Sequence, residues 1–149
     1  MARSTVAAKG TDVATDPSDA DWERLRVTAI EAMQRAYAPY SGFPVGVAGL
    51  ADDGRVLSGC NVENASFAVG LCAECGLVSE LVRTGGGRLV AVWCVDAHGQ
   101  TLMPCGRCRQ LLWEHGGPQC RIQTPLGERT LADILPQAFS AEDLTKGAP

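Results

Sequence analysis

Two cysteine motifs constrain this chain more than any other feature of its sequence. The segment PCGRC at 104–108 places Cys105 and Cys108 three positions apart, and the segment CAE at 72–74 places Cys72 33 positions before Cys105. A short turn can aim both sulfurs of a Cys-x-x-Cys pair at one Zn²⁺ ion, although redox dithiols use the same spacing. Each motif is expected to begin a helix, so the fold has to bring two helix N-termini together.

The cysteine count favours metal binding over a disulfide framework. The 149 residues include seven cysteines and only two histidines, and the N-terminal segment lacks the apolar core of a signal peptide. An odd number of cysteines in such a chain is a poor disulfide framework, and any metal must take most of its ligands from thiolates. Three of the cysteines outside the two motifs are expected to be small core residues: Cys60, Cys94 and Cys120.

Charge and hydropathy exclude two classes of partner. Thirteen basic residues stand against 17 acidic ones, for a net charge of −4, which argues against a nucleic-acid binder. No apolar run approaches the ~20 residues that span a bilayer. We therefore expect a cytoplasmic protein with no nucleic-acid or membrane partner. Residues 1–19 are polar and without periodicity, which predicts a disordered extension before a single domain at 20–149.

The hydrophobic pattern predicts an α/β fold. Helical spacing and stop signals favour four helices, and apolar runs bounded by turns favour five strands. The hairpin in the first half is antiparallel, whereas the strand–helix alternation in the second half favours parallel neighbours. The expected architecture is a three-layer α/β/α fold with a mixed, about five-stranded sheet. The predicted helices are 18–37, 72–83, 104–117 and 130–139, and the predicted strands are 45–51, 55–60, 88–96, 101–103 and 120–124.

Three thiolates and one carboxylate make a plausible catalytic set. Three sulfurs leave one tetrahedral position free, which is typical of catalytic zinc, whereas structural zinc has four protein ligands. Glu74 stands two residues after Cys72, close enough to move a proton of a metal-bound water without being a ligand. Helix N-termini favour thiolates at all three positions. A structural zinc module, or three buried free thiols, remains the alternative.

These motifs together resemble the zinc-dependent cytidine deaminases. Besides CAE and PCGRC, the segments YSGFPVG (40–46), NVEN (61–64), CRQ (108–110) and LPQAF (135–139) look like that family in the same order, over roughly residues 20–145. The resemblance implies a cytidine deaminase-like fold. It also implies hydrolysis of cytidine and 2′-deoxycytidine to uridine and 2′-deoxyuridine with release of ammonia, a reaction of pyrimidine salvage.

The resemblance assigns the chemistry to four residues. It implies one Zn²⁺ per chain, held by Cys72, Cys105 and Cys108. A zinc-bound hydroxide would attack C4 of the base, and Glu74 would serve as the proton shuttle between that water, ring N3 and the leaving ammonia.

The resemblance also implies a substrate site shared between subunits. Small members of the family are homotetramers whose active sites include residues of a neighbour. Many members have Tyr where this chain has Phe67, so the contact to a neighbour's substrate is expected from Ala65. Six residues are expected to bind substrate: Phe43 beside the base, Asn61 and Glu63 on the ribose 3′-hydroxyl, and Ala65, Ala73 and Phe139.

Arg109 is the cation expected to support the metal centre. Many relatives have Arg directly after Cys-Ala-Glu, where this chain has Cys75. Three thiolates around Zn²⁺ leave net negative charge, which opposes ionisation of a bound water. The guanidinium of Arg109, beside Cys108, is expected to donate to ligand sulfurs and draw charge from them, with an ordinary salt bridge as the alternative. Arg107 is expected to matter less.

Other functions share parts of this pattern. A blasticidin-type aminonucleoside deaminase has the same Cys-x-Glu and Pro-Cys-x-x-Cys frame, but by resemblance lacks a segment like 61–64. Polynucleotide deaminases mostly use His as their first ligand, and an acidic chain offers little to phosphates. A cytidine deaminase is therefore the leading hypothesis.

Overall fold

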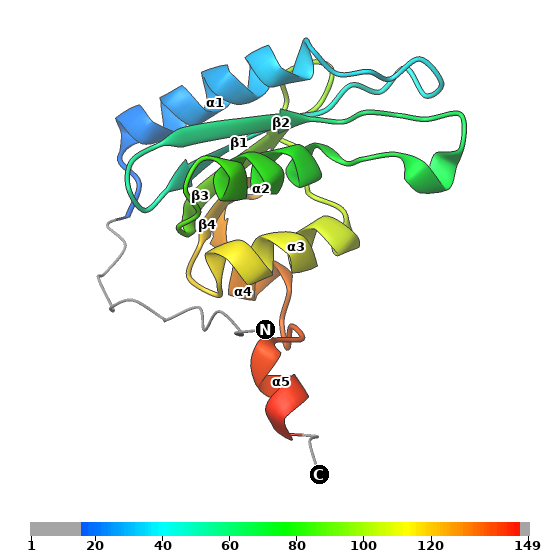
Figure 1. The fold of residues 1–149 in the computed structure, drawn as a ribbon. Helices are drawn as coiled ribbons and strands as arrows, with labels where there is room; N and C mark the ends of the chain where they lie inside the picture. The colour runs from blue at the N-terminus through cyan, green and yellow to red at the C-terminus, as the bar shows by residue number, and fades with distance from the viewer. Residues whose placement is uncertain (1–15, 147–149) are drawn as a thin grey trace.

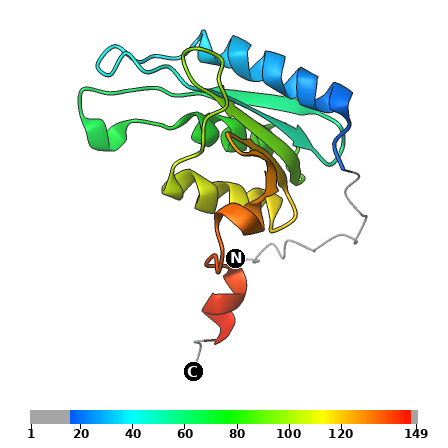
Figure 2. The same cartoon turned by 180° about the vertical axis from the view of Figure 1, so that it is seen from behind.

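A mixed five-stranded sheet forms the middle layer of the fold, in the order β2-β1-β3-β4-β5 (Figures 1 and 2). The structure is a computed structural model and describes residues 16–146. Strands β3 and β4 run parallel, and the other neighbouring pairs run antiparallel. The strands are β1 Gly46–Ala51, β2 Val56–Cys60, β3 Leu89–Val95, β4 Arg121–Thr124 and β5 Gly127–Thr130, and the helices are α1 Asp19–Met33, η1 Phe67–Val69, α2 Ala73–Arg83, α3 Gly106–Gly116, α4 Leu131–Ile134 and α5 Ala141–Lys146.

Helices cover both faces of the sheet, which confirms the predicted three-layer α/β/α architecture. Helix α1 lies on one face, and α2 and α3 lie side by side on the other (Figure 1). Successive strand residues point to opposite faces, so β3 serves both cores. Ala91 and Val95 pack with the α1 side chains, whereas Val92 and Cys94 pack with side chains of α2 and α3. The central strand is therefore buried on both faces, as its apolar run predicts.

The first helix is shorter than the predicted 18–37. A capping box between Ser18 and Asp21 begins it, and it ends at Met33. Beyond that point Tyr37 N–H donates to the carbonyl of Asn61 at 3.0 Å, so the chain bonds to the loop after β2 instead of continuing the helix.

The second half differs from the prediction at three places. The expected strand at 101–103 is reduced to a single bridge between Val95 and Thr101. Strand β5 was missed, because its pattern is short and polar, and it forms by pairing with β4. The expected helix at 130–139 ends at Ile134. Leu135 precedes a proline and takes a non-helical backbone conformation, with φ −140° and ψ 67°. A separate helix, α5, follows and extends away from the layered body (Figure 2).

The expected disordered extension at 1–19 lies mostly outside the described residues. Within 16–146, no helix is long and apolar enough to cross a membrane.

Candidate metal centre

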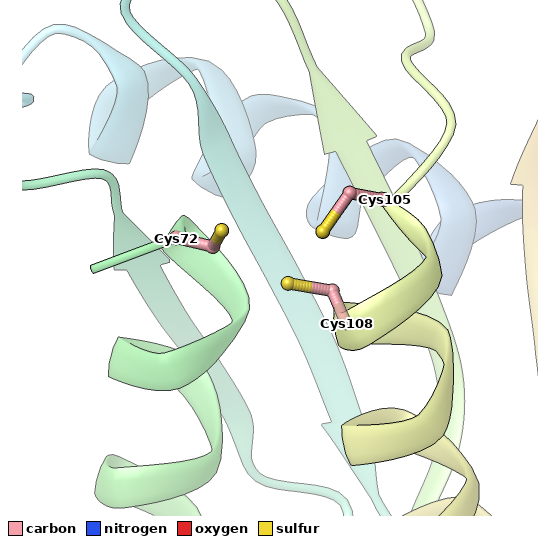
Figure 3. A group of neighbouring side chains, drawn as sticks. All are labelled: Cys72, Cys105 and Cys108. Carbon is pink, nitrogen blue, oxygen red and sulfur yellow. The ribbon is translucent and has the colours of Figure 1, made fainter. Parts of the chain in front are cut away.

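The structure brings the three predicted zinc ligands together. The Sγ atoms of Cys72, Cys105 and Cys108 all lie within 4.8 Å of one another. Figure 3 shows the side chains pointing toward one another, with Cys72 at the start of α2 and the other two at the start of α3. Cys105 is exposed and Cys108 is fully buried, so the cluster lies between the core and the surface.

Local backbone geometry explains how each thiol reaches the cluster. Cys72 and Cys105 are the N-cap residues of α2 and α3, with extended backbone angles. Cys108 is in the first turn of α3, where helix geometry places it over the same end as Cys105. Because α2 and α3 pack beside each other on one face of the sheet, their first turns meet.

The ionisation of the three thiols differs from the expectation. Burial raises the pKa of Cys72 and Cys108, and the carboxylate of Glu74 adds to the rise at Cys108. At Cys105 burial also acts to raise the pKa, but hydrogen bonds with Cys108 and Cys72 outweigh it and lower the pKa. Helix N-termini therefore do not by themselves favour a thiolate at every position, because desolvation and a nearby negative charge oppose them.

The donor set fits a zinc ion. Zn–S bonds of about 2.3 Å in a tetrahedron require sulfurs about 3.8 Å apart, a separation that agrees with three thiols lying within 4.8 Å of one another. The group contains three protein donors among the described residues, which leaves one tetrahedral position for another ligand. Metal binding displaces thiol protons, so the raised pKa values of the metal-free thiols are no obstacle.

Glu74 lies directly against this cluster. It is the second residue of α2 and only 4% exposed, with its carboxylate beside Cys108. The thiol of Cys94 also donates a hydrogen bond to Glu74 Oε1, with Sγ and Oε1 3.6 Å apart. The structure thus places a buried carboxylate next to the three thiols, as the sequence motif predicts.

The side chain of Asn61 holds the loop before β1. Its Oδ1 accepts from Val45 N at 2.8 Å, and its Nδ2 donates to the carbonyl of Phe43 at 3.0 Å. An amide has two acceptor lone pairs and two donor hydrogens, so each polar atom of Asn61 retains capacity for one more partner. The backbone of Phe43 is held by this contact, while the residue as a whole stays 48% exposed.

The carboxylate of Glu63 holds the same loop. It accepts from Tyr40 N at 2.9 Å, from Ser41 N at 3.2 Å and from Ser41 Oγ. Ser41 Oγ in turn accepts from Phe43 N at 3.0 Å. These bonds, that of Ser41 Oγ first, lower the pKa of Glu63. A carboxylate offers about four acceptor sites, so roughly one remains for a ligand hydroxyl.

A backbone bridge joins this loop network to the thiol cluster. Val62 pairs with Leu71 in an antiparallel bridge, with both N–O distances 2.9 Å. Val62 stands between Asn61 and Glu63, and Leu71 directly precedes Cys72. The two groups of predicted site residues are thus connected through one short bridge.

The other predicted substrate residues lie in different surroundings. Ala73 is buried at the first position of α2, whereas Ala65 is exposed in the loop that carries η1. Phe139 is 57% exposed, and its carbonyl accepts from Gln110 Nε2 at 2.8 Å, which ties the C-terminal segment to α3.

Arg109 makes different contacts from those expected. Its Nε donates to the carbonyl of Pro104 at 2.9 Å and its Nη1 to the carbonyl of Ile134 at 3.2 Å. These bonds brace the residue before Cys105, and no described hydrogen bond of Arg109 reaches a ligand sulfur. Arg107 instead donates to Cys75 Sγ at 3.7 Å.

Two residues at the site were not predicted from the sequence. Ser41 belongs to the YSGFPVG segment, and its place directly before Gly42 in that segment was the available signal. Cys94 lies inside an apolar run, where no local pattern distinguishes a thiol under the site from an ordinary core residue.

Comparisons with known proteins agree with this geometry. Residues 20–124 match the family model described as the cytidine and deoxycytidylate deaminase zinc-binding region. The matched range contains all three thiols and Glu74.

The match extends over almost the whole length of several similar proteins. It is 57% identical over 128 residues to a cytidine deaminase of Mycobacterium tuberculosis, covering 86% of this chain and 96% of that protein. A cytidine deaminase of Sporosarcina psychrophila is 37% identical over 133 residues, covering 86% and 98%. The crystal structure of cytidine deaminase from Mycobacterium leprae superposes with a TM-score of 0.77 at 61% identity, covering 78% of this chain and 98% of that one.

Proposed function

This chain belongs to the zinc-dependent cytidine deaminases, hydrolases that convert cytidine to uridine and ammonia, and we propose which of its residues perform that reaction. The observation that carries the assignment is the buried carboxylate of Glu74 against a cluster of three thiols that leaves one zinc position free. The proposal includes 2′-deoxycytidine as a second substrate.

Cys72, Cys105 and Cys108 hold the zinc ion. When bound, zinc acts as a Lewis acid that lowers the pKa of water at its open position and so makes a nucleophile available near neutral pH. The partly exposed side of the cluster admits substrate and water, while the buried side keeps the metal fixed by α2 and α3.

Glu74 moves the protons of the reaction. It accepts a proton from the attacking water, delivers it to N3 of the ring and assists departure of the amino group from C4 as ammonia. One water is consumed, one C–N bond is broken and one C–O bond is formed, so the atoms balance. The low exposure of Glu74 keeps bulk water from competing for these protons.

The loop network binds the sugar and the base. Asn61 and Glu63 each retain hydrogen-bonding capacity, and both are held by the loop that carries Phe43. Their amide and carboxylate can bind the ribose 3′-hydroxyl, and the exposed ring of Phe43 can pack beside the base. Ala73, directly after Cys72, contributes its backbone to substrate binding.

Replacing Glu74 by Gln tests the proposal. The zinc ligands are untouched, so Glu74→Gln retains about one zinc per chain, while turnover of cytidine falls by at least ~10²–10⁴-fold, as for loss of a general acid–base group. Ammonia release and metal content measured on the same sample give the result. A zinc-loaded Glu74→Gln protein with near wild-type turnover contradicts the role of Glu74, and a wild type that releases no ammonia from cytidine contradicts the function.

We also propose that the chain assembles as a homotetramer with shared active sites. The arm between β2 and α2, which carries η1, extends from the body (Figure 1). Three of its large apolar residues are exposed. Phe67 is 82% exposed, Val69 60% and Leu71 51%. Apolar side chains gathered on one surface favour a protein interface, and this arm includes Ala65. Phe139 at 57% exposure is the second expected contact with a neighbour's site.

Mixing two variants tests the sharing of sites, provided that the Phe139 change by itself lowers activity. Chains with Glu74→Gln and chains with Phe139→Ala are unfolded together, refolded and assayed. Recovered activity with a tetramer mass by sedimentation supports shared sites, whereas a fully active monomer contradicts them. The seven free thiols support a cytoplasmic location, because a reducing compartment keeps thiols unpaired.

A further inference from the structure

Cys94 lies directly beneath the proposed catalytic carboxylate. It is in β3, on the face covered by α2 and α3, and is completely buried in the core between them. Glu74, in the first turn of α2, sits over it and is 4% exposed. The contact joins residues 20 positions apart and depends on how α2 docks on the sheet.

The thiol acts as the donor in this contact. Cys94 Sγ lies 3.6 Å from Glu74 Oε1, within the range of sulfur hydrogen bonds. Burial, and then the charge of Glu74, raises the pKa of Cys94 well above its ordinary value of 9.0, so the S–H group keeps its proton. A buried carboxylate needs donors, and a thiol is a weak one that restrains the oxygen without protonating it.

The carboxylate of Glu74 therefore contacts two sulfurs with different tasks. Cys108 is a zinc ligand in the proposed site, and its pKa reflects the adjacent carboxylate. Cys94 belongs to the core and has no proposed metal role. A glutamate side chain has three rotatable bonds, and a contact on its core side restricts the orientations from which it can reach the metal centre.

We infer that Cys94 is a positioning residue for the deamination: its S–H group holds Oε1 of Glu74 on the core side and keeps the remaining acceptor capacity of the carboxylate directed at the reacting groups. This inference rests on the proposed role of Glu74. It predicts a defect in turnover that is separate from zinc binding and from substrate affinity.

Cys120 provides a matched control. It is also a buried cysteine of the same core, 2% exposed, but its Sγ contacts the carbonyl of Arg121 at 3.7 Å instead of Glu74. Removing either thiol takes the same volume from the core. A defect that follows only Cys94 therefore cannot be a general effect of core packing.

The kinetic experiment compares Cys94→Ala, Cys94→Ser and Cys120→Ala in the zinc-loaded protein. For Cys94→Ala, kcat for cytidine falls roughly 10-fold, the lower end of the range for residues that orient a metal site, while KM and zinc content stay near wild type. Cys94→Ser keeps a donor and gives a kcat above that of Cys94→Ala. Cys120→Ala keeps kcat within about twofold of wild type, as for a contact away from the reacting atoms. Equal kcat values for the two alanine variants, or a serine variant no better than alanine, overturn the inference.

An infrared measurement tests the hydrogen bond without using activity. Subtracting the spectrum of Cys94→Ala from that of wild type isolates the S–H stretching band of Cys94. A bond to a carboxylate lowers that frequency, and the band moves upward in Glu74→Ala protein, whereas the Cys120 band does not move. If the S–H stretching frequency of Cys94 is the same in wild type and in Glu74→Ala protein, the inference is overturned. A wild type that does not deaminate cytidine removes the proposed function instead, and the infrared result still decides the Cys94 contact.

Discussion

Gly59 of β2 and Gly76 of α2 lie back to back at the start of the helix that carries Glu74. A Cβ atom on Gly76 would lie 3.3 Å from Gly59 Cα, and one on Gly59 would come within 2.3 Å of the Ala73 carbonyl oxygen and 2.5 Å of Leu77 N. Two glycines therefore let the backbone of α2 approach the sheet closely. This approach sets the height of Cys72 and Glu74 above β3.

Gly59→Ala should push the first turn of α2 away from the sheet. The obstructing atoms are backbone atoms, which cannot move aside cheaply, so the free energy of unfolding should fall by about 3 kcal/mol, the upper end for overpacking. Urea unfolding with and without zinc measures the effect. Gly106→Ala is the control, since a Cβ there meets nothing within 4 Å, and equal losses in the two variants would refute the clash.

Ser41→Ala should raise the pKa of Glu63 toward its ordinary value of 4.5, because the Ser41 hydroxyl is the largest cause of the lowered value. A carboxyl whose folded pKa is lowered stabilises the protein above its unfolded pKa, and that stability is lost as pH falls through the folded pKa. The variant should therefore lose less stability than wild type as the pH falls below about 4.5.

Two measurements check this prediction. One is an NMR titration of the Glu63 carboxyl, and the other is the free energy of unfolding measured from about pH 3 to about pH 6, a range that brackets the ordinary pKa of glutamate. KM for cytidine should rise, because Glu63 loses a contact that holds its carboxylate in place for the sugar hydroxyl. Ser66→Ala, which removes a hydroxyl that makes no described contact with Glu63, should leave the pKa of Glu63 unchanged. An unchanged Glu63 pKa in Ser41→Ala would show that the hydroxyl does not hold the carboxylate.

Arg109→Ala should loosen the segment that precedes Cys105. It removes the donors to the Pro104 and Ile134 carbonyls, which should cost about 1–3 kcal/mol of unfolding free energy and speed the loss of zinc to a chelator. Arg107→Ala, an exposed change on the same turn, should do less on both measures. If the two variants lose zinc at the same rate, the bracing by Arg109 does not support the metal centre.

Zinc removal should lower stability without unfolding the chain. Two apolar cores hold the sheet between its helices independently of the metal, so far-UV circular dichroism should be nearly unchanged. The melting temperature should fall, since a ligand at 1,000 times its Kd stabilises by about 4 kcal/mol.

Cobalt substitution identifies the ligands in the same experiment. Co²⁺ should show thiolate charge-transfer bands in wild type and in Cys60→Ser, and weaker bands in Cys105→Ser. An apoprotein without secondary structure at 25 °C would contradict the metal-independent core.

The predicted site agrees with the structure where the signal is local. Cys105 and Cys108 are three positions apart at the start of one helix, a spacing that places both side chains on the same face, and Glu74 follows Cys72 within the first turn of another. The predicted central strand at 88–96 agrees with β3, because a continuous apolar run is typical of a strand that is buried on both faces of its sheet.

The prediction fails where pairing decides the structure. Strand β5 is polar and exists because β4 offers it a partner, whereas 101–103 finds only one bridge. Arg109 was assigned to the sulfurs because it neighbours Cys108 in sequence, but a helix turns each side chain by about 100° per residue, which directs it to the Pro104 and Ile134 carbonyls.

The sequence by itself indicated the metal ligands, the carboxylate and the alternating layers of this protein, because each has a local signal: two short cysteine motifs, and apolar patterns within single helices and strands. Only the tertiary structure decided that Cys94 lies under Glu74, that Ser41 holds Glu63 and that Gly59 lets the backbone of α2 approach β2 closely. Those contacts join residues 20, 22 and 14 positions apart. Their distances follow from strand register and helix docking, which arise from the packing of the whole core and not from any local pattern.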